Sequence, residues 1–154
     1  MEVRKGRWSN LLTLEPLRRL DDASLLALRV ATGTFLIHGV WDNMTEAARM
    51  VEFIEFMRTS GFPAPQFWAP FSVYTQFLAG LLILTGMLTR WAGLIVVITF
   101  VTGIVMVHWT QTLREWWPAL ALVVIGLVLA SRGAGCYAVD EMLFRQGNAR
   151  HDHA

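Results

Sequence analysis

Four long apolar runs dominate this chain, and short polar joints separate them. They cover residues 24–44, 67–88, 91–109 and 116–132. An α-helix rises about 1.5 Å per residue, so about 20 residues cross the hydrocarbon layer of a bilayer. The composition agrees, because 55% of the residues are hydrophobic and only 16% are charged, whereas soluble domains carry about 25% charged residues. The sequence therefore predicts an all-α membrane protein, a bundle of four transmembrane helices.

Residues 45–60, between the first and second spans, have a different pattern. Apolar side chains recur there at helical spacing and charged side chains fill the opposite face; the apolar ones are Met50, Val51, Phe53, Ile54 and Met57. A segment so short and so charged cannot span the bilayer, and the pattern is typical of a helix at the membrane surface. The sequence SGFPAP at 60–65 then ends the helix, because its glycine and two prolines oppose helical continuation.

The placement of basic residues predicts the orientation. Lysines and arginines gather in segment 1–23, at the joint that holds Arg90, and in the tail 133–154. Loops rich in Lys and Arg stay in the cytoplasm. We therefore expect a basic cytoplasmic segment (1–23), a membrane domain (24–132) and a cytoplasmic tail (133–154). Both termini would be cytoplasmic, and the short amphipathic helix would be external.

Several polar residues fall within the apolar spans. Placing a polar side chain in lipid costs free energy, so each of them is a candidate for a structural or functional role. His38 and His108 lie roughly 21 and 25 Å from the inner ends of their spans, and Gln76 lies roughly 14 Å from an outer end. Asp42 follows His38 by one helical turn and would orient its imidazole, and Tyr74 has a similar depth. These five residues predict a pocket in the outer half of the bundle that would bind a quinone headgroup. The alternative is that the histidines only bond neighbouring helices.

Other cofactors are less favoured. His38 and His108 could together ligate a haem iron, but the sequence offers no second histidine pair and no slot of small residues beside both. His151 and His153 stand at the end of the chain, and we predict no metal site there. Cys136 is the single cysteine, so the chain has no internal disulfide and no CxxC pair. This argues against a thiol oxidoreductase with its own redox cysteines, and no covalently bound cofactor is expected.

Arg29 is a separate feature of the first span. It precedes His38 by nine residues, which places the two side chains about 180° apart around a helix. It also lies within about 8 Å of the cytoplasmic end of the span, where a long side chain can reach the headgroups. The alternative is an internal ion pair, or a contact with an anionic headgroup or a partner protein. Glycines within the spans, at 80, 86, 93, 103 and 126, predict close approach of the helices.

Taken in order, several stretches of this chain resemble the DoxX family of small bacterial membrane proteins. They are LRVATG at 28–33, IHG at 37–39, residues 53–65 ending in SGFPAP, AGLLILTGMLTR at 79–90, and GAGCYAVD at 133–140. The resemblance covers about residues 24–143. It implies a four-helix membrane fold in the bacterial inner membrane, and a link to redox systems. Relatives include the membrane subunit of a thiosulfate:quinone oxidoreductase and partners of terminal oxidases.

The resemblance maps Arg29 and His38 onto the arginine and histidine of the family's first span. Two departures stand out. The family often has a lysine soon after the His-Gly pair, where this chain reads VWDN at 40–43. It often has a glutamate in the second span, near the place where Gln76 stands. The loss of an ionisable base at Gln76 weakens a proton-coupled mechanism.

The sequence thus predicts a DoxX-like membrane subunit of a redox complex that contacts quinone in the outer half of the bundle. Any enzymatic role would be that of a subunit without a redox centre of its own. The alternative is a non-catalytic accessory subunit that packs against a larger respiratory or photosynthetic complex. A small transporter is less favoured, because no span is broken at mid-membrane. The expected partners are the lipid bilayer and other membrane subunits, and the net charge of +1 gives no argument for nucleic acid.

Overall fold

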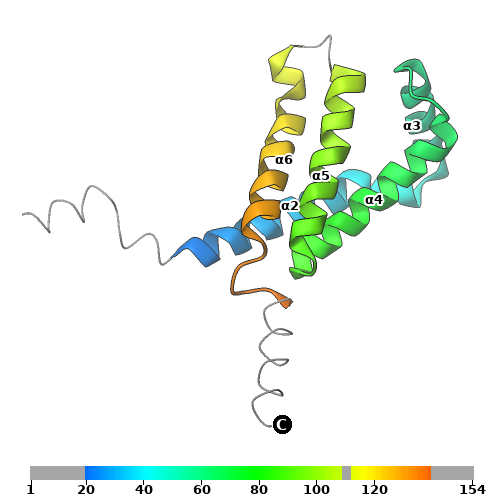
Figure 1. Ribbon diagram of the computed structural model, residues 1–154. Helices are drawn as coiled ribbons and strands as arrows, with labels where there is room; N and C mark the ends of the chain where they lie inside the picture. Colours follow the sequence, from blue (N-terminus) through cyan, green and yellow to red (C-terminus); the bar gives the residue numbers. More distant parts are fainter. Residues whose placement is uncertain (1–19, 109–111, 140–154) are drawn as a thin grey trace, which may run out of the picture.

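The computed structural model describes residues 20–108 and 112–139, and the described part is built of helices with no strand. Four of the helices are long and apolar enough to cross a membrane, and a short one connects the first two. The all-α fold with four spans is therefore confirmed (Figure 1). The elements are α2 (Asp21–Thr45), α3 (Ala47–Thr59), α4 (Pro65–Thr85), α5 (Thr89–Gly103), a π-helical turn η2 (Ile104–His108) and α6 (Leu113–Arg132).

The helix ends follow from local capping more than from hydropathy. α4 stops at Thr85 because Gly86 adopts φ 78°, and the backbone N–H groups of Gly86 and Met87 both donate to the Leu82 carbonyl, at 2.9 and 3.0 Å. α6 begins at Leu113, three residues before the predicted span, because Thr112 and Glu115 form a reciprocal capping box. Apolar runs therefore locate the spans, and the caps move their ends by a few residues.

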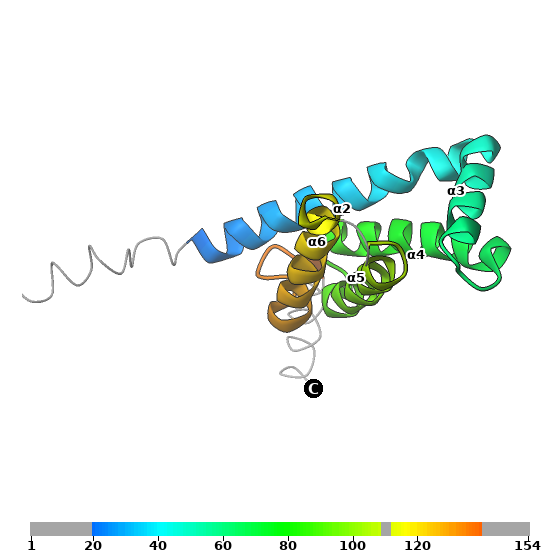
Figure 2. The ribbon, with the colours of Figure 1, turned by 90° about the horizontal axis from the view of Figure 1, so that it is seen from above.

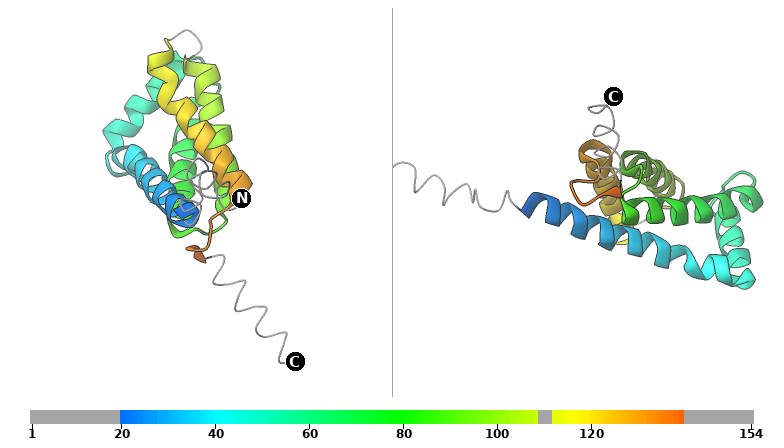
Figure 3. Two further views of the ribbon diagram at one scale, coloured as in Figure 1. Left: turned by 90° about the vertical axis from the view of Figure 1, so that its left-hand side faces the viewer. Right: turned by 90° about the horizontal axis from the view of Figure 1, so that it is seen from below.

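The long helices form two antiparallel pairs. α2 packs on α4, α5 packs on α6, and contacts between α4 and α5 join the pairs. The view from above shows α5 and α6 nearly end-on while α2 and α4 lie lengthwise, so the pairs are strongly inclined to each other (Figure 2). From below, α2 and α4 lie side by side and α3 crosses their far ends (Figure 3). We call the end where the pairs meet the closed end, and the end where they diverge the open end.

Each pair crosses at two glycines that face each other. A Cβ atom on Gly33 of α2 would lie 2.8 Å from the carbonyl oxygen of Gly80 on α4, and one on Gly80 would lie 3.0 Å from that of Gly33. The same reciprocal contact joins α5 and α6, where a Cβ on Gly93 would lie 2.6 Å from the Gly126 oxygen. The absence of a side chain lets the backbones touch.

The buried core lies where the pairs meet. It gathers small and branched apolar side chains from all four long helices, namely Leu36, Ala79, Ile83, Ala92, Val96, Leu122 and Leu129. Large apolar residues elsewhere on the same helices face outward, for example Leu78, Ile98 and Val124. That distribution fits a protein whose outer surface meets lipid chains, which are as apolar as leucine itself.

Candidate functional site

The closed end contains the most completely buried charged group among the described residues, the side chain of Arg29, which is 1% exposed. Its Nε donates to the Ile83 carbonyl at 3.0 Å and its Nη2 to the Leu84 carbonyl at 3.3 Å. Its Nη1 donates to the carbonyls of Ala134 and Tyr137, at 2.8 and 3.0 Å. The guanidinium is therefore turned into the protein and joins α2 to the end of α4 and to the loop after α6.

These contacts depend on how the chain ends α4. The last carbonyls of a helix have no intrahelical donor, so Ile83 and Leu84 can accept from Arg29. Gly86 leaves room for the guanidinium, because a Cβ atom there would collide with Nη2 and would also lie 3.0 Å from the Cβ of Ala138. Gly86 thus both adopts the left-handed conformation of the turn and leaves space for the guanidinium of Arg29.

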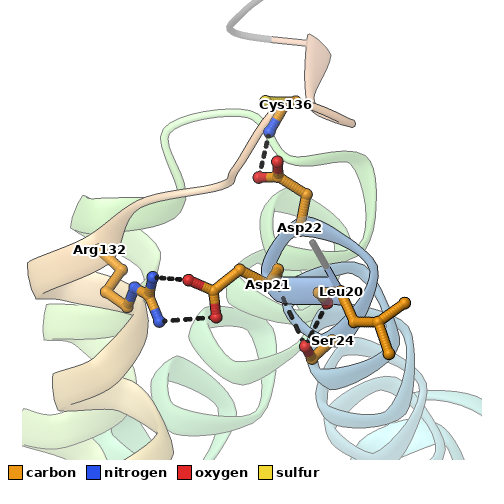
Figure 4. Close-up of polar contacts among 6 residues, drawn as sticks. All are labelled: Leu20, Asp21, Asp22, Ser24, Arg132 and Cys136. Carbon is orange, nitrogen blue, oxygen red and sulfur yellow. Dashed lines mark hydrogen bonds and ion pairs between the residues drawn. The ribbon is translucent and has the colours of Figure 1, made fainter. Parts of the chain in front are cut away.

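Two further contacts tie the start of α2 to the end of α6 and to the loop that follows it (Figure 4). Asp21 accepts two hydrogen bonds from the guanidinium of Arg132, at 2.7 and 3.5 Å, and both side chains are about half exposed. Asp22 accepts a hydrogen bond from the backbone N–H of Cys136 at 3.1 Å. Cys136 itself is exposed.

A pocket of about 600 Å³ opens beside these contacts. One part of its lining comes from the start of α5 and the turn before it, with Thr89, Arg90 and Trp91. The other comes from Asp22 and from the end of α6 with the loop that follows, including Arg132. Thr89 is 1% exposed, and its hydroxyl is the one buried side-chain polar atom of the described residues that makes no hydrogen bond.

The described side chains of the predicted quinone pocket lie toward the open end, on α2 and α4. His38 and Asp42 are exposed, on the side of α2 away from its buried stripe. Tyr74 is 56% exposed on α4, and the half-buried Gln76 donates to the hydroxyl of Ser72 at 3.0 Å. His108 ends the π-helical turn in the other pair, with its side chain outside the described part. The joint ligand site stays a prediction.

Asp42 instead borders a shallow pocket of about 440 Å³ between α2 and α3. Arg49 lies there and donates to Glu52 at 3.0 Å, and this hydrogen bond raises the pKa of Arg49. Asn43 donates to the Arg49 carbonyl at 3.2 Å. The charged side chains of this pocket therefore bond mainly within α3.

In the described ranges, no three His, Cys, Asp or Glu side chains gather closely enough to hold a metal ion, and the two histidines at 151 and 153 lie outside those ranges.

The fold defines a multi-pass α-helical membrane protein whose polar contacts concentrate at the closed end. The sequence model of the DoxX family matches residues 24–109, more than half of the chain, and the chain therefore belongs to the DoxX family. It is 27% identical over 131 residues to the inner membrane protein YqjF of Escherichia coli strain K12, and the match covers 82% of this chain and 97% of that protein. No solved structure matches the chain.

Sequence reasoning singled out Arg29 but did not find the groups that surround it. The carbonyls of Ile83, Ala134 and Tyr137 are backbone atoms, and any residue type could supply them. The pocket at the closed end was also missed. The one signal for it in the sequence is the string TRW at 89–91, where a hydroxyl and a guanidinium form the joint between the second and third spans.

Proposed function

We propose that this DoxX-family protein is a subunit of a redox complex in the bacterial inner membrane. In this proposal it docks on a partner membrane protein through the face of α2 that carries His38 and Asp42. The supporting observation is that an apolar span presents a histidine on its outside, on the side of α2 opposite the stripe that packs on α4.

Polar groups cost free energy in lipid, and this cost favours a partner that covers His38. His38 lies seven residues before the end of α2, roughly 10 Å along the helix axis. Ionisable side chains within membrane spans almost always face protein, water or another polar group. Among the described residues, none forms a hydrogen bond to His38, and the carboxylate of Asp42 has only a charge attraction to the exposed Arg49. A partner that covers this face would remove the cost, and the two side chains would recognise it by hydrogen bonds.

The proposal that the partner is a redox complex rests on the family resemblance. The family resemblance links such membrane subunits to quinone-linked enzymes, and the E. coli relative is named as an inner membrane protein. This chain has one cysteine, so electron transfer would rest on centres that a partner supplies.

A contact with quinone is the second candidate, and the spacing of His38 and Asp42 favours it. They lie one helical turn apart on one exposed face, so the carboxylate could orient an imidazole that donates to a quinone carbonyl. Because His38 and Asp42 are exposed on the side of α2 away from its buried stripe, we place such a quinone between this face and the partner.

Photo-crosslinking tests the docking face. A photoreactive phenylalanine analogue replaces His38, and in a control chain it replaces Thr102, an exposed polar residue of α5. After mild-detergent purification, we expect position 38 to yield an adduct with a subunit of a quinone-linked enzyme, and position 102 to yield none. Adducts with lipid alone at both positions would sink the docking proposal.

Quinone extraction tests the second candidate separately. We expect the purified complex to retain quinone, and His38→Leu to lower the quinone recovered per mole of protein while Thr102→Val leaves it unchanged. An unaltered yield with His38→Leu would remove the quinone contact and leave the docking proposal standing.

A further inference from the structure

The pocket at the closed end has the features of a site for a phosphate group, independently of the docking face. Its wall includes the N-terminus of α5, a helix of fifteen residues. The first N–H groups of a helix have no intrahelical acceptor, and they carry the positive end of the helix dipole. Leu88 precedes the helix with φ 46° and provides no side-chain cap. The donors of this first turn are therefore left for another acceptor.

Thr89 gives a second, independent indication of a ligand. Thr89 is one of the residues that line the pocket and is 1% exposed, yet its hydroxyl has no hydrogen-bond partner among the described residues. Buried polar groups are almost always hydrogen-bonded, because losing water without replacement costs free energy. An acceptor that enters the pocket would satisfy the hydroxyl.

The charges around the pocket favour an anion. Two guanidinium groups and one carboxylate line it, those of Arg90, Arg132 and Asp22, which gives a net charge of +1. Arg132 is already paired with Asp21, and Asp22 accepts the Cys136 N–H. Arg90 forms no ion pair within the described ranges. Its guanidinium is therefore the cation left for a ligand.

The surroundings suggest where such an anion would come from. Leu88 and Trp91 line the pocket and are 54% and 66% exposed, and tryptophan is enriched at the level of lipid headgroups. We propose that the pocket binds a phosphate group through Thr89, Arg90 and the N-terminal amides of α5. An anionic phospholipid would supply both the phosphate and the chains that cover Leu88 and Trp91. A soluble phosphate compound would supply only the former.

Lipid titration of the full chain tests the site. The protein, purified in detergent, is titrated with phosphatidylglycerol or phosphatidylcholine, and bound lipid is counted by native mass spectrometry. We expect phosphatidylglycerol to bind more tightly than phosphatidylcholine. Thr89→Val and Arg90→Gln should each weaken phosphatidylglycerol binding by about tenfold, or about 1.4 kcal/mol, because each removes a hydrogen bond to a charged group. Thr89→Ser keeps the hydroxyl and should bind as the wild type does.

Controls separate a lost site from a misfolded protein. Arg114→Gln removes an exposed arginine at the open end and should leave lipid binding unchanged. Without ligand, Thr89→Val should unfold at or above the temperature of the wild type, because it removes an unpaired hydroxyl from a buried place.

Inorganic phosphate distinguishes the two sources. If it raises the melting temperature of the wild type but not of Thr89→Val, and phosphatidylglycerol has no such effect, the phosphate belongs to a soluble compound. The reverse result assigns the site to a lipid. If both folded variants bind both probes as tightly as the wild type does, the phosphate site is overturned.

Discussion

Within each of the two helix pairs, α2–α4 and α5–α6, the helices meet at the same kind of glycine contact, but only one pair also contains a buried charged side chain. Each crosses at two glycines whose backbones touch, Gly33 with Gly80 and Gly93 with Gly126. The α2–α4 pair adds the buried guanidinium of Arg29, which bonds carbonyls at the end of α4. In the described ranges, no buried charge lies between α5 and α6.

The difference separates two ways of holding helices in a bilayer. Close backbone contact acts through van der Waals packing and is lost when a single methyl group intervenes. A buried guanidinium acts through hydrogen bonds that have no competing water. Because Arg29 also bonds the loop after α6, the polar device joins the two pairs, whereas each glycine contact acts within one pair.

The largest effect should come from Arg29→Met. The substitution removes the four hydrogen bonds described above and leaves the carbonyls that accept them without this donor. Hydrogen bonds to charged groups are worth about 1.5–3 kcal/mol each, so we expect a loss of about 3 kcal/mol or more of unfolding free energy. Thermal unfolding in detergent measures it.

Arg29→Lys sharpens this test. Lysine keeps the charge but concentrates its donors on one nitrogen, so it cannot reproduce the planar fork that reaches both α4 and the loop. We expect it to recover only part of the lost stability. If both variants unfold like the wild type, the carbonyls find other donors and the proposed difference between the pairs fails.

The next largest effect should come from alanine at the glycine contacts. A Cβ on Gly93 would lie 2.6 Å from the Gly126 oxygen and 2.8 Å from the Ala130 nitrogen, and both of these are backbone atoms. Forcing such a clash costs about 1–3 kcal/mol. Gly33→Ala meets the Gly80 oxygen at 2.8 Å and should cost less. Thermal unfolding of both variants compares the pairs directly.

Gly103→Ala is the matched control, because nothing lies within 4 Å of a Cβ atom built there. Alanine favours helix over glycine by up to about 1 kcal/mol, so this variant should be as stable as the wild type or more so. Equal losses at Gly93 and Gly103 would indicate a general effect of the added methyl group instead of a contact between α5 and α6.

The sequence predicted the spans well because length and hydropathy are properties of single helices. It says less about the direction in which each side chain faces, because that direction depends on how the helices are arranged. His38 and His108 have similar calculated depths, but depth does not say which way a side chain points or that the helix pairs diverge. Gly80, Gly93 and Gly126 do lie at the close contacts expected of them, whereas Gly86 seats Arg29 and Gly103 borders open space.

Asp21→Asn should have the smallest effect, although it breaks the ion pair between α2 and α6. One of its two hydrogen bonds to Arg132 is short, at 2.7 Å, but the other is long, at 3.5 Å, and both side chains are about half exposed. Water and salt screen exposed pairs, and ordering two side chains offsets much of the attraction. We expect a small drop in melting temperature at low ionic strength that vanishes in high salt, measured together with Arg132→Gln and the double variant. A salt-independent loss as large as that of Arg29→Met would mean that this surface pair, and not the buried guanidinium, holds the two helix pairs together.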